Sequence, residues 1–467
     1  MTYYDKYNKI HNRILLVIIF ILGIINILVA YRMNYLERIF IDKIPQSDIV
    51  FTNQIDNYYR QTYAFSKGSL SLIEDSSTVD KLSNPYDVNI RKNVYYLFDT
   101  SYYKGKYYSY YTALPTVFIL LPIYLVTHKF LNLVLVNFII LMLAVYFISK
   151  LYQLIVENYI KTIPLFIYVI SFLTIILSSN IFMLLRGLKY DLPVSCGILF
   201  ITLSIYSLFK IYNKKHLRLK LILSGIFISF IVCSKPTYVV YYLIFPYLIY
   251  KLFRKYNINF KNIIYILIPC IIIGLCQMTY NYLRYDSIFE FGAKYQLTGF
   301  NLIDYMGFSL SKFVRGLKFS LFTLPTFKNE FPYIFIKVIN DNEPFKEWLY
   351  ENIFLGVLVS PVVVYQLVLM FKKSKDKILN TCKNINLIVY IIFILLVLIN
   401  TSYGGISEIY FIDFKYVLIL INVISILLYL KNTNYSKYSV VLYSIAVIIN
   451  ILLVTTITYN FAYYQLF

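Results

Sequence analysis

The stretch "YYKGKYYSYYTALPTVFILLPIYLV", from Tyr102 to Val126, decides how this chain is arranged in a membrane. Its first half is rich in tyrosine, lysine and glycine, and its second half is an apolar run that contains Pro115 and Pro122. Such a run either crosses a bilayer or only enters one leaflet. Because each crossing moves the following loop to the other side, the answer sets the sidedness of the whole chain.

The composition is typical of a protein with many membrane-spanning helices. The chain has 467 residues, of which 59% are hydrophobic and 14% charged, and its mean hydropathy is +0.65. Soluble domains are about 25% charged. Apolar runs of about 17–25 residues recur along the chain, which is the length of a transmembrane helix. The sequence therefore predicts an all-α polytopic membrane protein with a single membrane domain over residues 1–467.

The first apolar run, Ile14–Ala30, follows a basic N-terminal segment, and no small-residue cleavage site comes after the run. We therefore expect it to be an uncleaved signal anchor.

Basic residues are concentrated in the short connectors between the apolar runs. Two long polar segments, 32–111 and 284–350, are nearly neutral, with about 10 basic and 9 acidic residues in the first and about 8 and 7 in the second. The N-terminus and five connectors together hold about 21 basic and about 3 acidic residues. These connectors are 150–161, 210–220, 251–261, 372–383 and 431–437. Lysine and arginine collect in short cytoplasmic connectors, so we expect the N-terminus and the connectors inside and the two long segments outside. This topology accounts for the net charge of +21 without a nucleic-acid partner.

The charge distribution predicts that the run Thr112–Val126 does not cross. It lies with Phe130–Ile148 between an outer segment and an inner connector, and only an odd number of crossings joins opposite sides. The first run is the shorter and contains two prolines, so we expect it to form a re-entrant or juxtamembrane helix packed against protein. The first outer loop then covers residues 32–129 and the second covers 284–350. The expected spans, about eleven, are approximately Ile14–Ala30, Phe130–Ile148, Ile163–Ser179, Leu192–Phe209, Leu221–Cys233, Tyr238–Tyr250, Ile263–Tyr282, Asn352–Phe371, Leu387–Asn400, Tyr410–Leu430 and Ser439–Tyr459.

The first outer loop contains a predicted helix with a carboxylate on one face. A helix that begins after Thr52 and ends near Gly68 places Asp56, Tyr59 and Arg60 on the same side. The plain interpretation is a surface helix with an Asp56–Arg60 ion pair and tyrosines at the membrane interface. The functional interpretation is that Asp56 is a general base, kept ionised by the neighbouring arginine.

The same loop continues with charged residues and many tyrosines. Asp87 and Arg91 are four residues apart, Asp99 follows, and Tyr107 and Tyr108 lie in the densest tyrosine run. Sugars have apolar faces edged with hydroxyl groups, which suits tyrosine, but an interfacial aromatic belt contains the same residue type. We include these five residues, with Tyr59 and Arg60, among the candidate substrate-binding residues.

Cations at the expected outer ends of spans form a second set of candidates. Lys235, Arg284 and Lys294, with Tyr295 beside the last, lie where a lipid-linked phosphate would be bound. Such residues also snorkel to the interface without binding anything. The five cysteines and three histidines are scattered, so the sequence predicts no disulfide framework and no zinc site. It requires no cofactor, and nothing in it indicates a divalent metal, although it is compatible with one.

Several segments, in order, resemble the C-type membrane glycosyltransferases, the GT-C superfamily. "DNYY", from Asp56, resembles the family's acidic position after the first span, and "GKYYSYYTALPTVFILLPIYLV" resembles the stretch that enters its juxtamembrane helix. "RGLKYDLPVSCG" is similar to its outer junction before a span, and "SKPTYVV" to its lysine/arginine–proline turn. "NPYD…R", "NYLRYDSIFEFGAKYQLT" and "IYFIDF" resemble segments of a bacterial subgroup. This chain departs from many relatives because Asn57 follows Asp56 where a second acid is common, Ala113-Leu114-Pro115 stands in place of paired prolines, and Lys235 replaces an arginine.

The resemblance implies an enzyme of the bacterial cytoplasmic membrane with an extracytoplasmic active site. It implies inverting transfer of a sugar from a polyprenyl-phosphate donor to a glycan, lipid or protein acceptor of the cell envelope. Asp56 would be the catalytic base, and cations among Arg91, Lys235, Arg284 and Lys294 would stabilise the leaving phosphate. Two other classes stay open: a flippase or transporter of a lipid-linked saccharide, and a non-catalytic assembly partner. The sequence lacks the internal repeat typical of many transporters.

Overall fold

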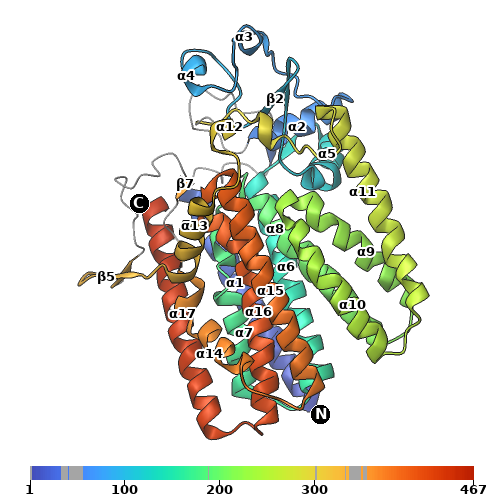
Figure 1. The fold of residues 1–467 in the computed structure, drawn as a ribbon, viewed down its shortest axis with the longest axis vertical. Coiled ribbons are helices and arrows are strands. Elements are labelled where there is room, and N and C mark those ends of the chain that lie inside the picture. Colours follow the sequence, from blue (N-terminus) through green and yellow to red (C-terminus); the bar gives the residue numbers. More distant parts are fainter. Residues whose placement is uncertain are drawn as a thin grey trace.

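The computed structural model of this chain is a bundle of long helices that carries a small cap at one end (Figure 1). The structure describes residues 3–32, 40–41, 56–187, 189–299, 302–331, 333–335, 349–350 and 355–466. Within these residues, eight helices are long and apolar enough to cross a membrane. They are built on α1 (Tyr3–Arg32), α6 (Leu133–Ile155), α8 (Asp191–Phe209), α9 (Leu217–Ser234), α11 (Ile264–Tyr285), α15 (Lys377–Tyr403), α16 (Glu408–Asn432) and α17 (Lys437–Leu466). Short helices η2 (Val156–Ile160) and η4 (Lys210–Tyr212) extend α6 and α8, and η6 (Phe260–Ile263) precedes α11. The mostly helical, multi-span architecture agrees with the predicted fold class.

Three of the expected spans do not correspond to a single long α-helix. Ile163–Ser179 contains α7 (Leu165–Leu177), and Tyr238–Tyr250 falls on the 3₁₀ helix η5 (Pro236–Leu243) followed by α10 (Ile244–Lys255). Asn352–Phe371 contains η8 (Val357–Val359) and α14 (Pro361–Met370), and its first residues lie outside the described ones. A straight span needs about 20 residues. Crossing by these three segments, and therefore the count of about eleven, stays a prediction.

The basic connectors lie together at the end of the bundle opposite the cap. Around Tyr159, Lys431 Nζ donates to the backbone carbonyl at 3.0 Å, Lys255 Nζ lies 3.4 Å from the ring centroid, and the Phe209 ring is 5.4 Å away. The N-terminal segment joins this end because Gln153 donates to Asn8 at 2.5 Å. In Figure 1 the N-terminus and the turn between α16 and α17 mark this end. The basic connectors therefore lie on one side of the bundle. That this side is the cytoplasmic one stays a prediction.

The run that begins at Thr112 remains at the cap end. Its apolar part forms η1 (Thr116–Leu120) and α5 (Leu121–Thr127), a helical stretch about 18 Å long, whereas the hydrocarbon core of a bilayer is about 30 Å thick. It packs against α2 (Asp56–Ser66), where Thr116 donates to Gln61 at 2.7 Å. From there α6 alone runs on to the connector 150–161.

Parts of both long polar segments build the cap, which consists of residues 56–111 and 286–305 where described. Its first part contains α2, α3 (Ser77–Asp80), α4 (Val88–Arg91) and the antiparallel hairpin of β2 (Ser101–Tyr103) and β3 (Lys106–Tyr108). Its second part contains η7 (Ala293–Tyr295) and α12 (Leu302–Tyr305). Leu297 of the second part is fully buried in the same small core as Ala64, Leu72, Val79, Leu97, Tyr102 and Tyr107. The two segments therefore fold as one unit.

The rest of the second long segment lies along the bundle. α13 (Leu310–Phe322) packs against α15, and a Cβ added to Gly316 would lie only 2.3 Å from the Thr401 side chain, so this close approach requires glycine. Short two-residue pairings complete the fold: β1 (Phe40–Ile41) with β4 (Phe130–Leu131), β5 (Thr326–Phe327) with β6 (Ile334–Phe335), and β7 (Leu349–Tyr350) with β8 (Gly405–Ile406).

Thiol labelling tests the sidedness. Single cysteines at Lys104, His128 and Lys215, all exposed positions, would be probed with a membrane-impermeant reagent in a background without the native cysteines. We expect labelling from outside at Lys104 and His128 but not at Lys215, because the first two lie at the cap end and the third in a basic connector. Labelling of the cysteine at position 215 from outside would contradict the predicted topology and would place the basic connectors on the outer side.

Candidate functional site

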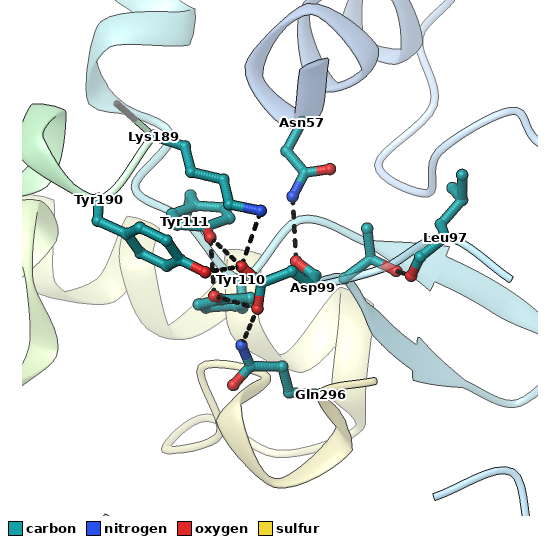
Figure 2. Close-up of polar contacts among 9 residues, drawn as sticks. Asn57, Leu97, Asp99, Tyr110, Tyr111, Lys189, Tyr190 and Gln296 are labelled. Atoms are coloured by element: carbon teal, nitrogen blue, oxygen red, sulfur yellow. Dashed lines mark hydrogen bonds and ion pairs between the residues drawn. The ribbon is translucent and has the colours of Figure 1, made fainter. Parts of the chain in front are cut away.

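The carboxylate of Asp99 is the centre of a buried polar cluster between the cap and the bundle (Figure 2). Its side chain is 2% exposed, and five groups donate to its two oxygens. These are Lys189 at 2.8 Å, Tyr111 at 2.7 Å, Tyr110 at 2.9 Å, and Tyr190 and Gln296. The donors come from the segment after β3, the junction before α8 and the second part of the cap.

Three chain segments fix the backbone at Asp99. The residue has φ +61°, in the left-handed region, and its N–H donates to the Leu297 carbonyl at 2.8 Å. The Leu297 N–H returns a bond to the Thr100 carbonyl at 2.8 Å. Asn57, the second residue of α2, donates from Nδ2 to the Asp99 carbonyl at 3.0 Å. The start of α2 is thereby held against the cluster.

Lys189 follows a break in the helices, the 3₁₀ helix η3 (Ile181–Arg186) between α7 and α8. Backbone groups outside a regular helix need other partners when they are buried at membrane depth. Asn26 of α1 and Asn137 of α6 donate to carbonyl groups of η3 at 3.0 Å and 2.6 Å. Lys415 of α16 donates to the Asn180 side chain just before η3 at 2.9 Å. Side chains from three span candidates therefore hold the break that delivers Lys189.

The ionisation of the cluster follows from its contacts. Burial opposes the charge on Asp99, but the Lys189 ammonium and the hydrogen bonds from Lys189, Tyr190 and Tyr111 outweigh it and lower the pKa of the carboxyl group. Burial first, and the Asp99 charge second, raise the pKa of Tyr110, Tyr111 and Tyr190. The tyrosines therefore stay protonated donors and Asp99 stays an ionised acceptor. Because five donors occupy its oxygens, Asp99 has little capacity left to accept a proton from a substrate.

A second ion pair joins the partly buried Lys235 to the buried Asp413. Lys235, at the end of α9, forms an ion pair with the Asp413 carboxylate in the second turn of α16, and Tyr238 donates to the same carboxylate at 2.7 Å. The Lys235 ammonium also lies 4.7 Å from the Tyr410 ring centroid. Lys235, predicted as a cation for a substrate phosphate, is thus already neutralised by a carboxylate from the chain itself.

Arg284 is buried and holds the segment that leads to Tyr110. Its guanidinium group donates to the carbonyl of Ser109 at 2.7 Å and to the Asn281 side chain at 3.1 Å, and it lies 3.7 Å from the Tyr280 ring centroid. Within the described residues it contacts no carboxylate. It is a cation without an acidic partner there, close to the Asp99 cluster.

Arg91 and Asp87 have structural contacts in the cap. The Arg91 side chain is 1% exposed, donates to the Thr298 carbonyl at 3.0 Å and stacks 4.5 Å from the Tyr96 ring centroid. Asp87 caps α4 by accepting from the Asn89 N–H at 2.8 Å. Arg91 therefore joins the two parts of the cap, whereas Asp87 caps a helix within the first part.

The three candidate residues on α2, Asp56, Tyr59 and Arg60, have different surroundings in the structure. Asp56 is the first residue of the helix, but its side chain lies outside the described ones, so its predicted pair with Arg60 does as well. Arg60 forms an ion pair with Glu74. Tyr59 is 1% exposed and accepts the Leu133 N–H at 3.1 Å, which fixes the start of α6.

The tyrosine candidates form an aromatic patch on the cap. Tyr295 is half-buried, with its ring centroid 4.6 Å from that of Tyr103 and 5.8 Å from that of Tyr285. Tyr108 packs 5.4 Å from Tyr285, whereas Tyr107 is buried in the cap core. Lys294 beside the patch is exposed.

Residue spacing did not identify the donors around Asp99. Lys189 and Tyr190 follow a span junction in "RGLKYD", and Gln296 lies in the second long segment. Their only signal in the sequence is their place at expected outer span ends. In the part of the chain that the structure describes, no group of three or more His, Cys, Asp or Glu side chains is arranged to hold a metal ion.

Comparisons of this chain with protein-family models, with curated proteins and with solved structures find no match.

Proposed function

We propose that this protein is a membrane glycosyltransferase that moves a sugar from a polyprenyl-phosphate donor to a cell-envelope acceptor at the cap end of the bundle. The observation that carries the proposal is the attachment of α2 to the Asp99–Lys189 pair by Asn57. It puts the first residue of α2, Asp56, beside a rigid polar layer where the cap meets the apolar bundle. A lipid-linked sugar would have its reactive carbon at this level, with its polyprenyl chain in the bilayer.

The proposed reaction is a direct displacement. Asp56 takes the proton from the acceptor hydroxyl group, the oxygen bonds to the anomeric carbon, and the bond from that carbon to the phosphate oxygen breaks. The polyprenyl phosphate leaves with the bonding electron pair. Arg284 is the predicted cation that we assign to its charge, because it binds the backbone next to Tyr110 of the Asp99 cluster and has no carboxylate partner among the described residues, whereas Lys235 is paired with Asp413. Tyr103 and Tyr295, which are partly exposed and pack on the buried Tyr285, offer aromatic faces to a sugar.

Asn57 has a role in this proposal that a second acid could not fill. Its amide donates a hydrogen bond to the Asp99 carbonyl, and an ionised carboxylate has no proton to donate. Many GT-C glycosyltransferases have a second acid at this position. In this proposal, asparagine stands there because it anchors α2 to Asp99.

One observation favours a transporter of lipid-linked saccharide as the second candidate. Lys415 is a buried cation within a span candidate, and it lies next to the broken helix at η3. Intramembrane charges and interrupted helices are typical of transport pathways. The contacts of Lys415 also have a structural explanation, since they hold η3 in place.

Glycan analysis and reconstitution separate the two functions. In a strain without the gene we expect mass spectrometry to detect accumulated polyprenyl-phosphate sugar and the loss of one sugar from a surface glycan. Purified protein in liposomes should release polyprenyl phosphate when donor and acceptor are on the cap side. Movement of an unaltered lipid-linked saccharide across the bilayer, without release of polyprenyl phosphate, would establish transport instead.

A further inference from the structure

A short hairpin extends sideways from the bundle beside α17 (Figure 1). Its strands β5 and β6 pair antiparallel, with Phe327 opposite Ile334, and β6 packs against α17. The hairpin directly follows α13, which runs along α15 away from the cap. It therefore leaves the bundle at its side and does not belong to the cap, although it lies in a segment predicted to be an outer loop.

Large apolar side chains of this hairpin and its flanks are mostly exposed. Leu324, Phe327, Phe331 and Tyr333 are 63%, 74%, 70% and 57% exposed. On the preceding helix α13, the apolar residues Leu310, Val314 and Phe322 are also more than half exposed. Exposed large apolar side chains that gather in one segment mark an interaction site when they occur on a stable protein.

The charges around the hairpin favour a membrane surface. From residue 310 to residue 335 the chain contains Lys312, Arg315, Lys318 and Lys328 but a single acidic residue, Glu330. Lys318 and Lys328 are exposed, and Lys328 lies 4.7 Å from the Phe335 ring centroid. Aromatic rings with neighbouring lysines are typical of the zone between hydrocarbon and headgroups, where anionic lipids attract basic side chains.

The surface next to the hairpin belongs to a span candidate. α17 exposes a row of apolar side chains, which includes Ile445, Ile448 and Leu452, as expected for a helix that faces lipid. The hairpin packs against this helix through β6 and extends sideways from it. The same lipid that covers α17 would therefore also reach Phe327 and Phe331.

We propose that the hairpin of β5 and β6 is an interfacial anchor that inserts its aromatic side chains into the bilayer leaflet next to the cap. Phe327, Phe331 and Tyr333 enter the boundary of the hydrocarbon, while Lys318 and Lys328 reach the headgroups. The anchor ties the second long segment to the membrane at a point separate from the bundle. It does not depend on the proposed transferase activity, since it rests on the exposed apolar side chains, the nearby lysines and the contact with α17.

Tryptophan quenching by brominated lipids tests the anchor. Trp348 is the chain's only tryptophan, so Trp348→Phe gives a silent background for Phe331→Trp in full-length protein in nanodiscs. We expect acyl-chain bromines to remove about half of the emission of Phe331→Trp, as for an aromatic residue at the interface. Leu275→Trp, exposed on α11, is the quenched control, and Tyr95→Trp, exposed on the cap, is the unquenched control.

The results separate a lipid anchor from other surfaces. If Phe331→Trp behaves like Tyr95→Trp and is quenched by iodide from water, the hairpin is solvated and the proposal is wrong. Shielding from both bromine and iodide would mean that protein covers the tip, which also overturns it. Tyr333→Trp repeats the measurement if Phe331→Trp does not fold.

Discussion

Replacing Asp56 by asparagine should lower sugar transfer by a factor of about 10² or more, with donor binding and protein level retained. Asparagine has nearly the shape of aspartate but cannot take a proton from the acceptor hydroxyl group. The measurement is the rate of polyprenyl-phosphate release by the purified variant in liposomes. Asp75→Asn is the matched control, because Asp75 is an exposed carboxylate of the same cap that accepts hydrogen bonds from the nearby Ser77.

Near-normal transfer by Asp56→Asn would remove Asp56 from the mechanism. Asp87 would then be the next candidate, since it is only partly buried and one of its oxygens caps α4. Asp99 is the weaker substitute, because five donors already hold its carboxylate. Loss of activity in Asp75→Asn as well would indicate that the cap as a whole is sensitive to its charge.

The membrane architecture was predictable because its signals are local. The shorter length and the two prolines separate the run 112–126 from the candidate spans, and lysine counts group the connectors without any knowledge of packing. The structure places these connectors around Tyr159 at one end of the bundle. The short segments were harder, because α7 ends early where η3 begins and side chains of distant helices satisfy that break.

The candidate site was predictable only in part, because its contacts join residues far apart in the chain. Asp99 and Lys235 were identified by type and position, but their partners Lys189 and Asp413 are separated from them by long stretches of sequence. Lys235 shows the consequence: a lysine at an outer span end suggests a free cation, whereas pairing with Asp413 makes it a structural contact between α9 and α16. No residue spacing encodes such a pairing.

The Asp99–Lys189 pair should dominate the stability of the cap. Both side chains are buried, 2% and 3% exposed, so removing one partner leaves a charge without compensation. We expect Asp99→Asn and Lys189→Met each to lower the free energy of unfolding by about 3–5 kcal/mol. The double variant should be more stable than the sum of the two losses predicts, because it removes both charges. Denaturant unfolding of the purified protein measures all three.

The exposed pair of Lys104 and Asp286, at 2.7 Å, is the control, and Lys104→Met should have little effect because water screens that pair.

The low pKa of Asp99 adds a dependence on pH. Its contribution is fully present above the ordinary value of 3.8, which applies to the unfolded chain, and is lost as the pH falls toward the lower pKa of the folded state. The stability difference between the wild-type protein and Asp99→Asn should therefore be constant near neutral pH and shrink only in strong acid. A difference that shrinks already between pH 7 and pH 5 would mean that Asp99 is not held as an ionised partner of Lys189.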